Sequence, residues 1–166
     1  MRSIRSLKHS YGIWNMPTQQ HKASLQFLDA DELVKMRVES EWGEKVARHM
    51  HLTDGFSIVA LQGETLAGLI STYWKNLPAP LNQEFDAYID ILEVHRDFRR
   101  QGIARRLIEL AIEKARQKGM RQIRAWSSEE KTEAIRMWKA LDFGLCPATI
   151  YSNSQEIKGF FVVIPL

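Results

Sequence analysis

An apolar strand and an amphipathic helix are joined in this chain by a short loop that is rich in arginine. The loop and its two ends, Val94–Ala104, read VHRDFRRQGIA, and the run before them, Ala87–Val94, reads AYIDILEV, which is β-branched and apolar. After the loop, apolar side chains recur at helical spacing: Ile103, Ala104, Leu107, Ile108, Ala111, Ile112 and Ala115. A strand, a small-residue turn and a helix N-terminus therefore follow one another directly.

This junction has the physical features of a polyphosphate site. The first N–H groups of a helix lack intrahelical partners and carry partial positive charge, so an anion at that end is stabilised. Gly102 permits backbone conformations that other residues avoid, and Ala104 keeps a second position free of bulk. Five arginines lie between Arg96 and Arg106, and guanidinium groups bind phosphate oxygens through charge-assisted hydrogen bonds.

Other phosphate-binding motifs do not fit the pattern Arg99-x-x-Gly102-x-Ala104. No Lys followed by Ser or Thr comes after Gly102, which excludes a P-loop, and the three glycines of a dinucleotide-binding fingerprint are missing. The alternative is a glycine in a tight turn followed by a solvated basic helix start. The position between a strand and a helix favours phosphate binding over that alternative.

The same segment closely resembles the cofactor-binding motif of the GNAT superfamily, the acyl-CoA-dependent N-acetyltransferases. The matching positions are Val94, His95, Asp97, Phe98, Arg99, Gly102 and Ala104. Further along, Ala134-Ile135-x-x-Trp138-x-x-Leu141-x-Phe143 is similar to the family's C-terminal helix and the turn after it. The resemblance implies acetyl-CoA as co-substrate. The residues that it assigns to cofactor binding are Leu92, Val94, Arg99, Arg100, Gln101, Gly102, Ile103, Ala104 and Arg105.

Hydrophobic periodicity and turn residues predict the order strand, helix, three strands, helix, strand, helix, two strands. This order is expected of the family and implies an α/β (α+β) fold, a mixed, mostly antiparallel sheet of about seven strands with helices on both faces. Strands are predicted at 23–28, 56–62, 65–74, 85–94, 122–126, 148–152 and 160–165, and helices at 32–50, at 102–118 and up to 141. A break is expected at Gly43, and Ser127 with Glu130 is expected to form a capping box.

Length and composition favour a single cytoplasmic domain. A chain of 166 residues suits one core, so we expect an N-terminal arm at 1–22 and one N-acetyltransferase domain at 23–166. No apolar run approaches the ~18 residues of a membrane span, no signal-peptide core follows the N-terminus, and the one cysteine, Cys146, fits a reducing compartment and a packing role. Much of the positive charge lies in the arginine cluster, so neither nucleic acid nor membrane is an expected partner. A homodimer stays open.

The strand predicted before the arginine loop changes phase. Apolar residues occupy alternate positions from Phe85 to Ile91, after which Leu92 and Val94 are apolar and Glu93 is polar. A one-residue slip predicts a β-bulge; the alternative is a strand end that leaves the core. In the resembled family this strand is bulged and splays from its neighbour, which opens a slot where a main-chain N–H polarises the thioester carbonyl. That role falls here on the backbone from Leu92 to Val94.

Attack of an amine on a thioester requires an unprotonated amine, so a carboxylate or its water relay is useful as a general base. Asp90 matches a position where many family members carry an acidic residue that faces the acceptor, and Glu93 lies nearer the slot but on the opposite strand parity. Both are candidate catalytic residues; the alternative for each is a solvated or ion-paired carboxylate. His49-x-His51 lacks a third ligand at a motif spacing, so surface histidines are expected there and no metal site.

Trp138 stands where many family members have a tyrosine whose phenol protonates the leaving thiolate, which an indole cannot do. The proton then comes from Tyr151, Tyr88 or water, or the thiolate leaves without an acid. We therefore expect an N-acetyltransferase that moves an acetyl group from acetyl-CoA to a primary amine of a small molecule, peptide or protein by direct attack in a ternary complex. The alternative is a catalytically weak CoA-binding sensor or interaction module of the same fold.

Overall fold

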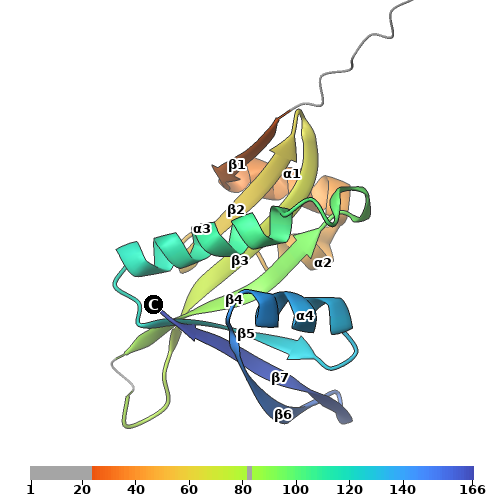
Figure 1. Cartoon of the computed structure of the whole chain (residues 1–166). Helices are drawn as coiled ribbons and strands as arrows, with labels where there is room; N and C mark the ends of the chain where they lie inside the picture. The colour runs from red at the N-terminus through yellow and green to blue at the C-terminus, as the bar shows by residue number, and fades with distance from the viewer. Residues whose placement is uncertain (1–23, 82–83) are drawn as a thin grey trace, which may run out of the picture.

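Seven strands form one mixed sheet in the part of the chain that the computed structural model describes, residues 24–81 and 84–166. The strands are β1 (Leu25–Asp29), β2 (Gly55–Gln62), β3 (Thr65–Asn76), β4 (Phe85–Val94), β5 (Gln122–Ser128), β6 (Gly144–Ser152) and β7 (Gln155–Pro165). Their order is β1-β2-β3-β4-β5-β7-β6, and β4–β5 is the one parallel pair among these strands. The predicted α/β class and its mostly antiparallel sheet are confirmed (Figure 1). The expected arm at 1–22 lies outside the described residues.

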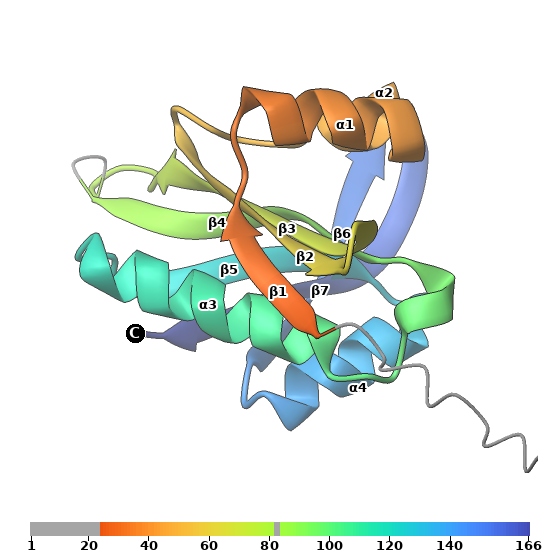
Figure 2. The same ribbon diagram turned by 90° about the horizontal axis from the view of Figure 1, so that it is seen from above.

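Helices cover both faces of this sheet, as expected. They are α1 (Glu32–Trp42), α2 (Glu44–Ala47), α3 (Ile103–Gln117) and α4 (Thr132–Ala140), with a 3-10 turn η1 (Arg96–Phe98). Figure 2 shows α1 and α2 on one side of the sheet and α3 and α4 on the other. We call these the α1/α2 face and the α3/α4 face. No helix in the described part of the chain has both the length and the apolar character that crossing a membrane requires.

The α3/α4 face holds the larger core. The predicted stripe of α3 is buried, with Leu107, Ile108 and Ala111 fully inaccessible, and it packs on β2, β3 and β4. A smaller core under α1 and α2 includes Val38 and Met50. The break predicted at Gly43 is present, because Gly43 has φ +94° and separates the two helices.

The predicted bulge is also present, and the inserted residue is Asp90. In the β3–β4 ladder Thr72 lies opposite Ile89 while Ser71 lies opposite Ile91, so Asp90 has no partner in β3. The extra residue explains the phase change, since Ile89 packs in the core of the α3/α4 face and Ile91 packs on the α1/α2 face. The side chain after the bulge, Leu92, returns to the α3/α4 face.

The sequence-based expectations were wrong around Ser127 and Cys146. Ser127 is buried within β5 and pairs with Phe160 of β7, so the ladder extends the strand to Ser128 and no capping box forms. The last helix instead begins at Thr132, after Lys131, whose side chain caps nothing. Cys146 was expected to pack in the core, yet its thiol is free and the residue is exposed, because β6 is an edge strand with no buried residue.

Gly68 of β3 lets α3 approach the sheet closely. A Cβ at this position would lie 2.8 Å from Ile103 Cγ2 and 3.1 Å from Leu107 Cδ1. Both neighbours are buried, so they cannot swing away. We expect Gly68→Ala to lower the free energy of unfolding in urea by about 1–3 kcal/mol through overpacking.

Gly144→Ala is the matched control, because its Cβ would meet nothing closer than 3.5 Å. It should leave the stability within about 0.5 kcal/mol of the parent. Equal losses in the two variants would contradict the close approach of α3.

Candidate active site

A slot opens in the sheet where β4 and β5 separate. Only two residue pairs join these strands, Ala87 with Ile123 and Tyr88 with Arg124. Beyond them β5 continues to pair with β7, while β4 continues beside β3, and the two strands diverge (Figure 1). The splay expected for this strand is therefore present, and it begins just before the bulge at Asp90.

A buried ion pair marks the point where the strands still meet. Asp86 is 1% exposed and accepts a hydrogen bond from Gln122 Nε2 at 2.9 Å. Arg124 Nε lies 2.5 Å from Asp86 Oδ2, close enough for an ion pair although the N–H is not aligned as a hydrogen bond. Both partners of Asp86 come from β5, so the carboxylate ties the start of β4 to the start of β5.

The slot passes through the sheet. Its cavity of about 400 Å³ is walled by the diverging strands, from Ile89 to Glu93 and from Ala125 to Ser127. On the α1/α2 face it is bordered by Lys45, Val46 and His49, and on the α3/α4 face by Lys131, Ala134, Met137 and Trp138. Because the two sets of side chains come from opposite faces, molecules entering from either side can meet between β4 and β5.

On the α3/α4 face the slot adjoins a cavity of about 480 Å³ at the N-terminus of α3. Gly102 precedes the helix with φ +80°, no side chain caps the helix, and nothing lies within 4 Å of the place where a Cβ would be. The first-turn N–H groups therefore face open space, as an anion site requires. The cavity is lined by Leu92, Glu93, Val94, Phe98, Arg99, Arg100, Gly102, Ile103, Ala104, Arg105, Glu133, Ala134, Arg136 and Met137.

Eight of the nine residues assigned to cofactor binding line this cavity; the ninth, Gln101, donates a hydrogen bond from Nε2 to the Asp97 carbonyl oxygen at 3.3 Å. The arginines differ in their partners. Arg99 donates to the Val94 carbonyl oxygen at 3.0 Å and to Glu93 at 3.3 Å. Within the described part of the chain, Arg100 and Arg105 form no ion pair, so their charge is available to a ligand.

The two carboxylates proposed from the sequence have different surroundings. Glu93 is held by Arg99 and lies at the boundary of both cavities. Asp90 lies on the bulge and contacts two histidines instead: its Oδ2 is 2.8 Å from His49 Nδ1 and 3.2 Å from His51 Nε2. The Asp90 side chain is 27% exposed, so the carboxylate is half-sheltered but reachable.

His49 and His51 were expected to be surface histidines, and the structure brings both of them to the candidate base. The spacing His-x-His directly after α2 was the available signal in the sequence. It did not indicate that Asp90, which lies on the bulge 39 residues after His51, would contact these histidines. Among the described residues no group of three or more His, Cys, Asp or Glu side chains is arranged to hold a metal ion.

Buried serines fix the position of His51. The His51 backbone N–H donates to Ser71 Oγ at 2.8 Å, and Ser57 Oγ donates to the His51 carbonyl oxygen at 3.0 Å. The two hydroxyls are also 2.9 Å apart, and both serines are at most 1% exposed. On its outer side the ring lies against Asp54, whose two carboxylate oxygens are 3.0 and 2.9 Å from His51 Nδ1.

Two tyrosines adjoin this cluster. The Tyr73 ring lies 4.7 Å from the His51 ring and 5.4 Å from the Tyr88 ring, measured between centroids. Burial raises the pKa of Tyr88, and Tyr73 and the negative charge of Asp90 add to the rise. Burial and then Asp90 likewise raise the pKa of Tyr73. Both phenols therefore remain protonated well above neutral pH.

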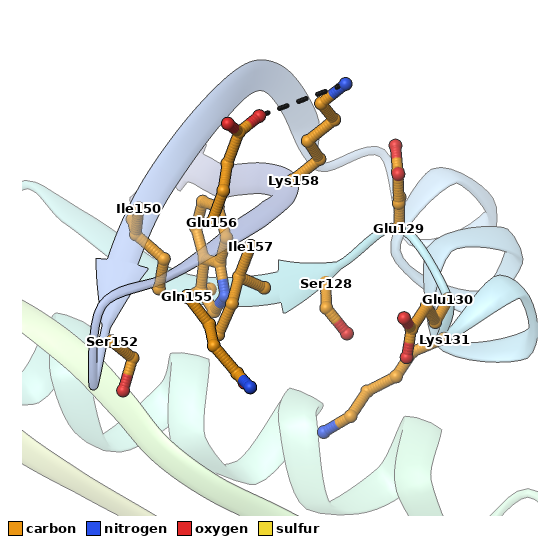
Figure 3. Close-up of a pocket in the computed structure, with 11 residues that line it drawn as sticks. Ser128, Glu129, Glu130, Lys131, Ile150, Ser152, Gln155, Glu156, Ile157 and Lys158 are labelled. Carbon is orange, nitrogen blue, oxygen red and sulfur yellow. Dashed lines mark ion pairs between the residues drawn. The ribbon is translucent and has the colours of Figure 1, made fainter.

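A third cavity, a hollow of about 780 Å³, lies between the end of β5 and the β6–β7 hairpin. Figure 3 shows Lys131 and Gln155 pointing into it, with Glu156 and Lys158 paired at its rim. The hollow shares Trp126 and Lys131 with the slot. Ala125 packs in the core of the α3/α4 face, so strand alternation turns Trp126 to the α1/α2 face, toward which the hairpin curves in Figure 2.

Trp138, which replaces the family's tyrosine, lines the slot on the α3/α4 face. It is 4% exposed, and its ring lies 4.8 Å from that of Phe143. Of the alternative proton donors, Tyr151 is 75% exposed on the edge strand β6, and Tyr88 lies beside Tyr73 on the α1/α2 face. Neither phenol lines the slot.

Comparisons with known proteins agree with this geometry. Residues 15–143 match the family model of the Acetyltransferase (GNAT) family. No curated protein sequence matches the chain. Among solved structures, Arabidopsis thaliana NAA60 in complex with acetyl-CoA has a TM-score of 0.71 and 16% identity over 86% of this chain and 100% of that one.

Two bacterial structures are similar to about the same degree. The ribosomal-protein-S18-alanine N-acetyltransferase from Escherichia coli has a TM-score of 0.65 and 14% identity over 86% of this chain and 94% of that one. A GNAT family acetyltransferase from Elizabethkingia anophelis with acetyl-CoA bound has a TM-score of 0.61 and 16% identity over 86% and 98%. The match of the family model, together with the splayed β4–β5 pair and the open N-terminus of α3, establishes that the chain belongs to the GNAT family of acetyltransferases.

Proposed function

We propose that this protein transfers an acetyl group from acetyl-CoA to a primary amine, by direct attack of the amine while both substrates are bound. The observation that carries the proposal is the slot between β4 and β5, which is open to both faces of the sheet and has an anion site on one side and a carboxylate on the other. Membership of the GNAT family and the acetyl-CoA bound in two similar structures support the choice of donor.

In this scheme the pyrophosphate of acetyl-CoA is held at the N-terminus of α3. The first-turn N–H groups after Gly102 bind its oxygens, and Arg100 and Arg105 neutralise its charge. The pantetheine arm then lies along the backbone from Leu92 to Val94, which β5 leaves without a partner. A main-chain N–H of this stretch polarises the thioester carbonyl.

The acceptor enters from the α1/α2 face and reaches Asp90. A cationic amine is attracted to this carboxylate, which then takes a proton from it as the general base. Glu93 is the second candidate base, but its ion pair with Arg99 makes it better suited to holding that arginine beside the phosphate site. The hollow under the β6–β7 hairpin leaves room for the remainder of the acceptor.

The proton for the leaving thiolate has a different source from the usual tyrosine. Trp138 has no acidic proton to give, and neither Tyr88 nor Tyr151 lines the slot. We propose that the second proton of the attacking amine reaches the thiolate, directly or through water. No side-chain acid is then required, and Trp138 shapes the slot.

The acceptor is a small molecule, a peptide or a protein. In support, NAA60 has been solved with a bisubstrate analogue and the NatC complex with a Gag peptide and CoA.

The described residues from 24 onward form one sheet with its helices, which supports a single domain at 23–166. The free thiol of Cys146 supports a reducing compartment, the cytoplasm.

The cofactor site can be tested with arginine variants. We expect the double variant Arg100→Gln, Arg105→Gln to raise the Kd for acetyl-CoA at least about 10-fold in titration calorimetry, because charge-assisted contacts contribute ~1.5 kcal/mol or more. Arg106→Gln is the control, since Arg106 is already paired with Glu109 and Glu113. Equal effects of the control and the double variant would contradict the assigned site.

The reaction can be tested by measuring free thiol released from acetyl-CoA with a panel of amines. We expect turnover with at least one cationic amine, and a fall of about 100-fold or more in kcat/KM for that amine in Asp90→Asn. The KM for acetyl-CoA should change little, since Asp90 lies outside the phosphate-site cavity. Tight CoA binding without transfer to any amine would favour the alternative, a CoA-binding sensor or interaction module.

The charge of Asp90 can be read from the neighbouring phenols. Asp90→Asn should lower the pKa of Tyr73 and Tyr88 in an ultraviolet titration, because the carboxylate helps to raise both. A raised pKa disfavours the phenolate in the folded state, so this contribution to stability is complete below about pH 10 and is lost as the pH rises further. Unchanged phenol titrations would show that Asp90 is uncharged or remote.

A further inference from the structure

We propose that His51, together with Asp54, carries the proton that the acceptor amine gives up from Asp90 to solvent. The inference rests on the proposed acetyl transfer and extends it to a relay of three side chains, Asp90, His51 and Asp54. His51 acts through Asp90 and is therefore a positioning residue, which orients the carboxylate and takes its proton onward.

The contacts of His51 place one ring nitrogen at each end of the relay. Nε2 lies 3.2 Å from Asp90 Oδ2, and Nδ1 lies 2.9 Å from Asp54 Oδ2. The Asp54 side chain is 62% exposed, whereas that of His51 is 20% exposed. The chain of contacts therefore runs from the slot through a sheltered imidazole to a carboxylate in water.

An imidazole between two carboxylates can take up a proton at one ring nitrogen and release another from the second nitrogen, which changes its tautomer until it exchanges a proton with water. A neutral ring donates from one nitrogen and accepts at the other, and a protonated ring donates from both. The buried pair Ser57 and Ser71 holds the His51 backbone, and the ring lies against Tyr73, so both nitrogens stay directed at their carboxylates.

The proton balance of the reaction requires such an exit. An ammonium acceptor and acetyl-CoA give an amide, free CoA thiol and one proton. The N–H bond that breaks on the amine becomes an O–H bond on Asp90, the proton moves to His51 Nε2, and the proton on His51 Nδ1 moves to Asp54 and then to water. The ring then carries its proton on Nε2 and regains the Nδ1–H tautomer by proton exchange with water, which its 20% exposure allows. The amine lone pair forms the C–N bond, the C–S bond breaks, and the second amine proton protonates the sulfur.

Other charged groups face the same site and shape its pH dependence. His49 contacts Asp90 from the end of α2, with Nδ1 at 2.8 Å from the same oxygen that faces His51. Tyr73 and Tyr88 lie beside the cluster from β3 and β4, and Arg124 acts on both phenols from β5. His49 is 40% exposed and contacts no carboxylate other than Asp90 in the part of the chain that the structure describes, so it supports Asp90 but does not extend the relay.

The kinetic test uses the full chain with the amine that wild-type protein acetylates. We expect His51→Gln and His51→Ala to lower kcat by about 10-fold or more, less than a direct general base contributes, with the KM for acetyl-CoA unchanged. The pH profile of kcat/KM for the amine should change shape in both variants. Added imidazole should restore His51→Ala but not Asp90→Asn. Asp54→Asn should also lower kcat. Asp142→Asn is the control and should leave kcat unchanged, because Asp142 is exposed in the turn after α4.

A second measurement does not depend on turnover. In spectra of protein with ¹⁵N-labelled histidine, the ring signals of His51, assigned by their loss in His51→Gln, should shift in both Asp54→Asn and Asp90→Asn. The signals of His95, which contacts Asp97 instead, serve as the internal control. If wild-type protein binds acetyl-CoA but acetylates no amine, the proposed function fails, and these spectra still decide whether His51 links the two carboxylates.

Three results would overturn the relay. One is a His51→Gln variant with wild-type kcat and pH profile in an active enzyme. The second is a His51 ring that responds to neither aspartate substitution. A loss of activity in His51→Ala that imidazole does not restore, together with a lower unfolding midpoint, would assign the residue to folding instead.

Discussion

The separation of β4 from β5 is the constraint on which the site depends. Two strands that remained paired along their length would leave no main chain free and no passage between the faces of the sheet. The ladder ends after two residue pairs, where Asp86 is held by Gln122 and Arg124, and the bulge at Asp90 follows at once. The buried carboxylate keeps one end closed while β3 and β7 draw the other ends apart.

The two openings of the slot have different chemistry, and this difference follows from the folding of each face. The α3/α4 face contains the larger core, so the arginines around α3 lie at its rim and surround an exposed helix N-terminus. The α1/α2 face has a smaller core, and polar groups from the α2–β2 connection and from β3 fill the space beside the bulge. One opening therefore presents arginines and a helix N-terminus, and the other presents the Asp90 carboxylate with its two histidines.

The arrangement of the elements could be predicted from the sequence because it depends on local patterns. The apolar stripe of α3, the break at Gly43 and the phase change of β4 each have a direct physical cause, and each is present. The spacing of Ser127 to Glu130 predicts a helix N-cap. The pairing of Ser127 with β7 is a non-local interaction, which this local spacing does not indicate.

The candidate site likewise has one part that local sequence patterns predict and one part that depends on non-local contacts. Gly102 and the arginines occupy adjacent positions, so their gathering around one cavity could be predicted from the sequence. The cluster of Asp90 with His49 and His51 joins segments about 40 residues apart through a bulge and a pair of buried serines, and no local pattern indicates that these meet. Histidines with the pattern of surface residues therefore contact the candidate base.

The exposed β6–β7 hairpin has a consequence for how such an enzyme can diversify. No residue of β6 is buried, and the hairpin borders the hollow on the side from which the acceptor would enter. The exposed side chains of β6 can therefore be exchanged at little cost in folding stability, whereas the N-terminus of α3 is tied to the core through Ile103. Evolution, or a protein engineer, can retune the preference for one amine over another there while the half of the site that recognises the donor stays as it is.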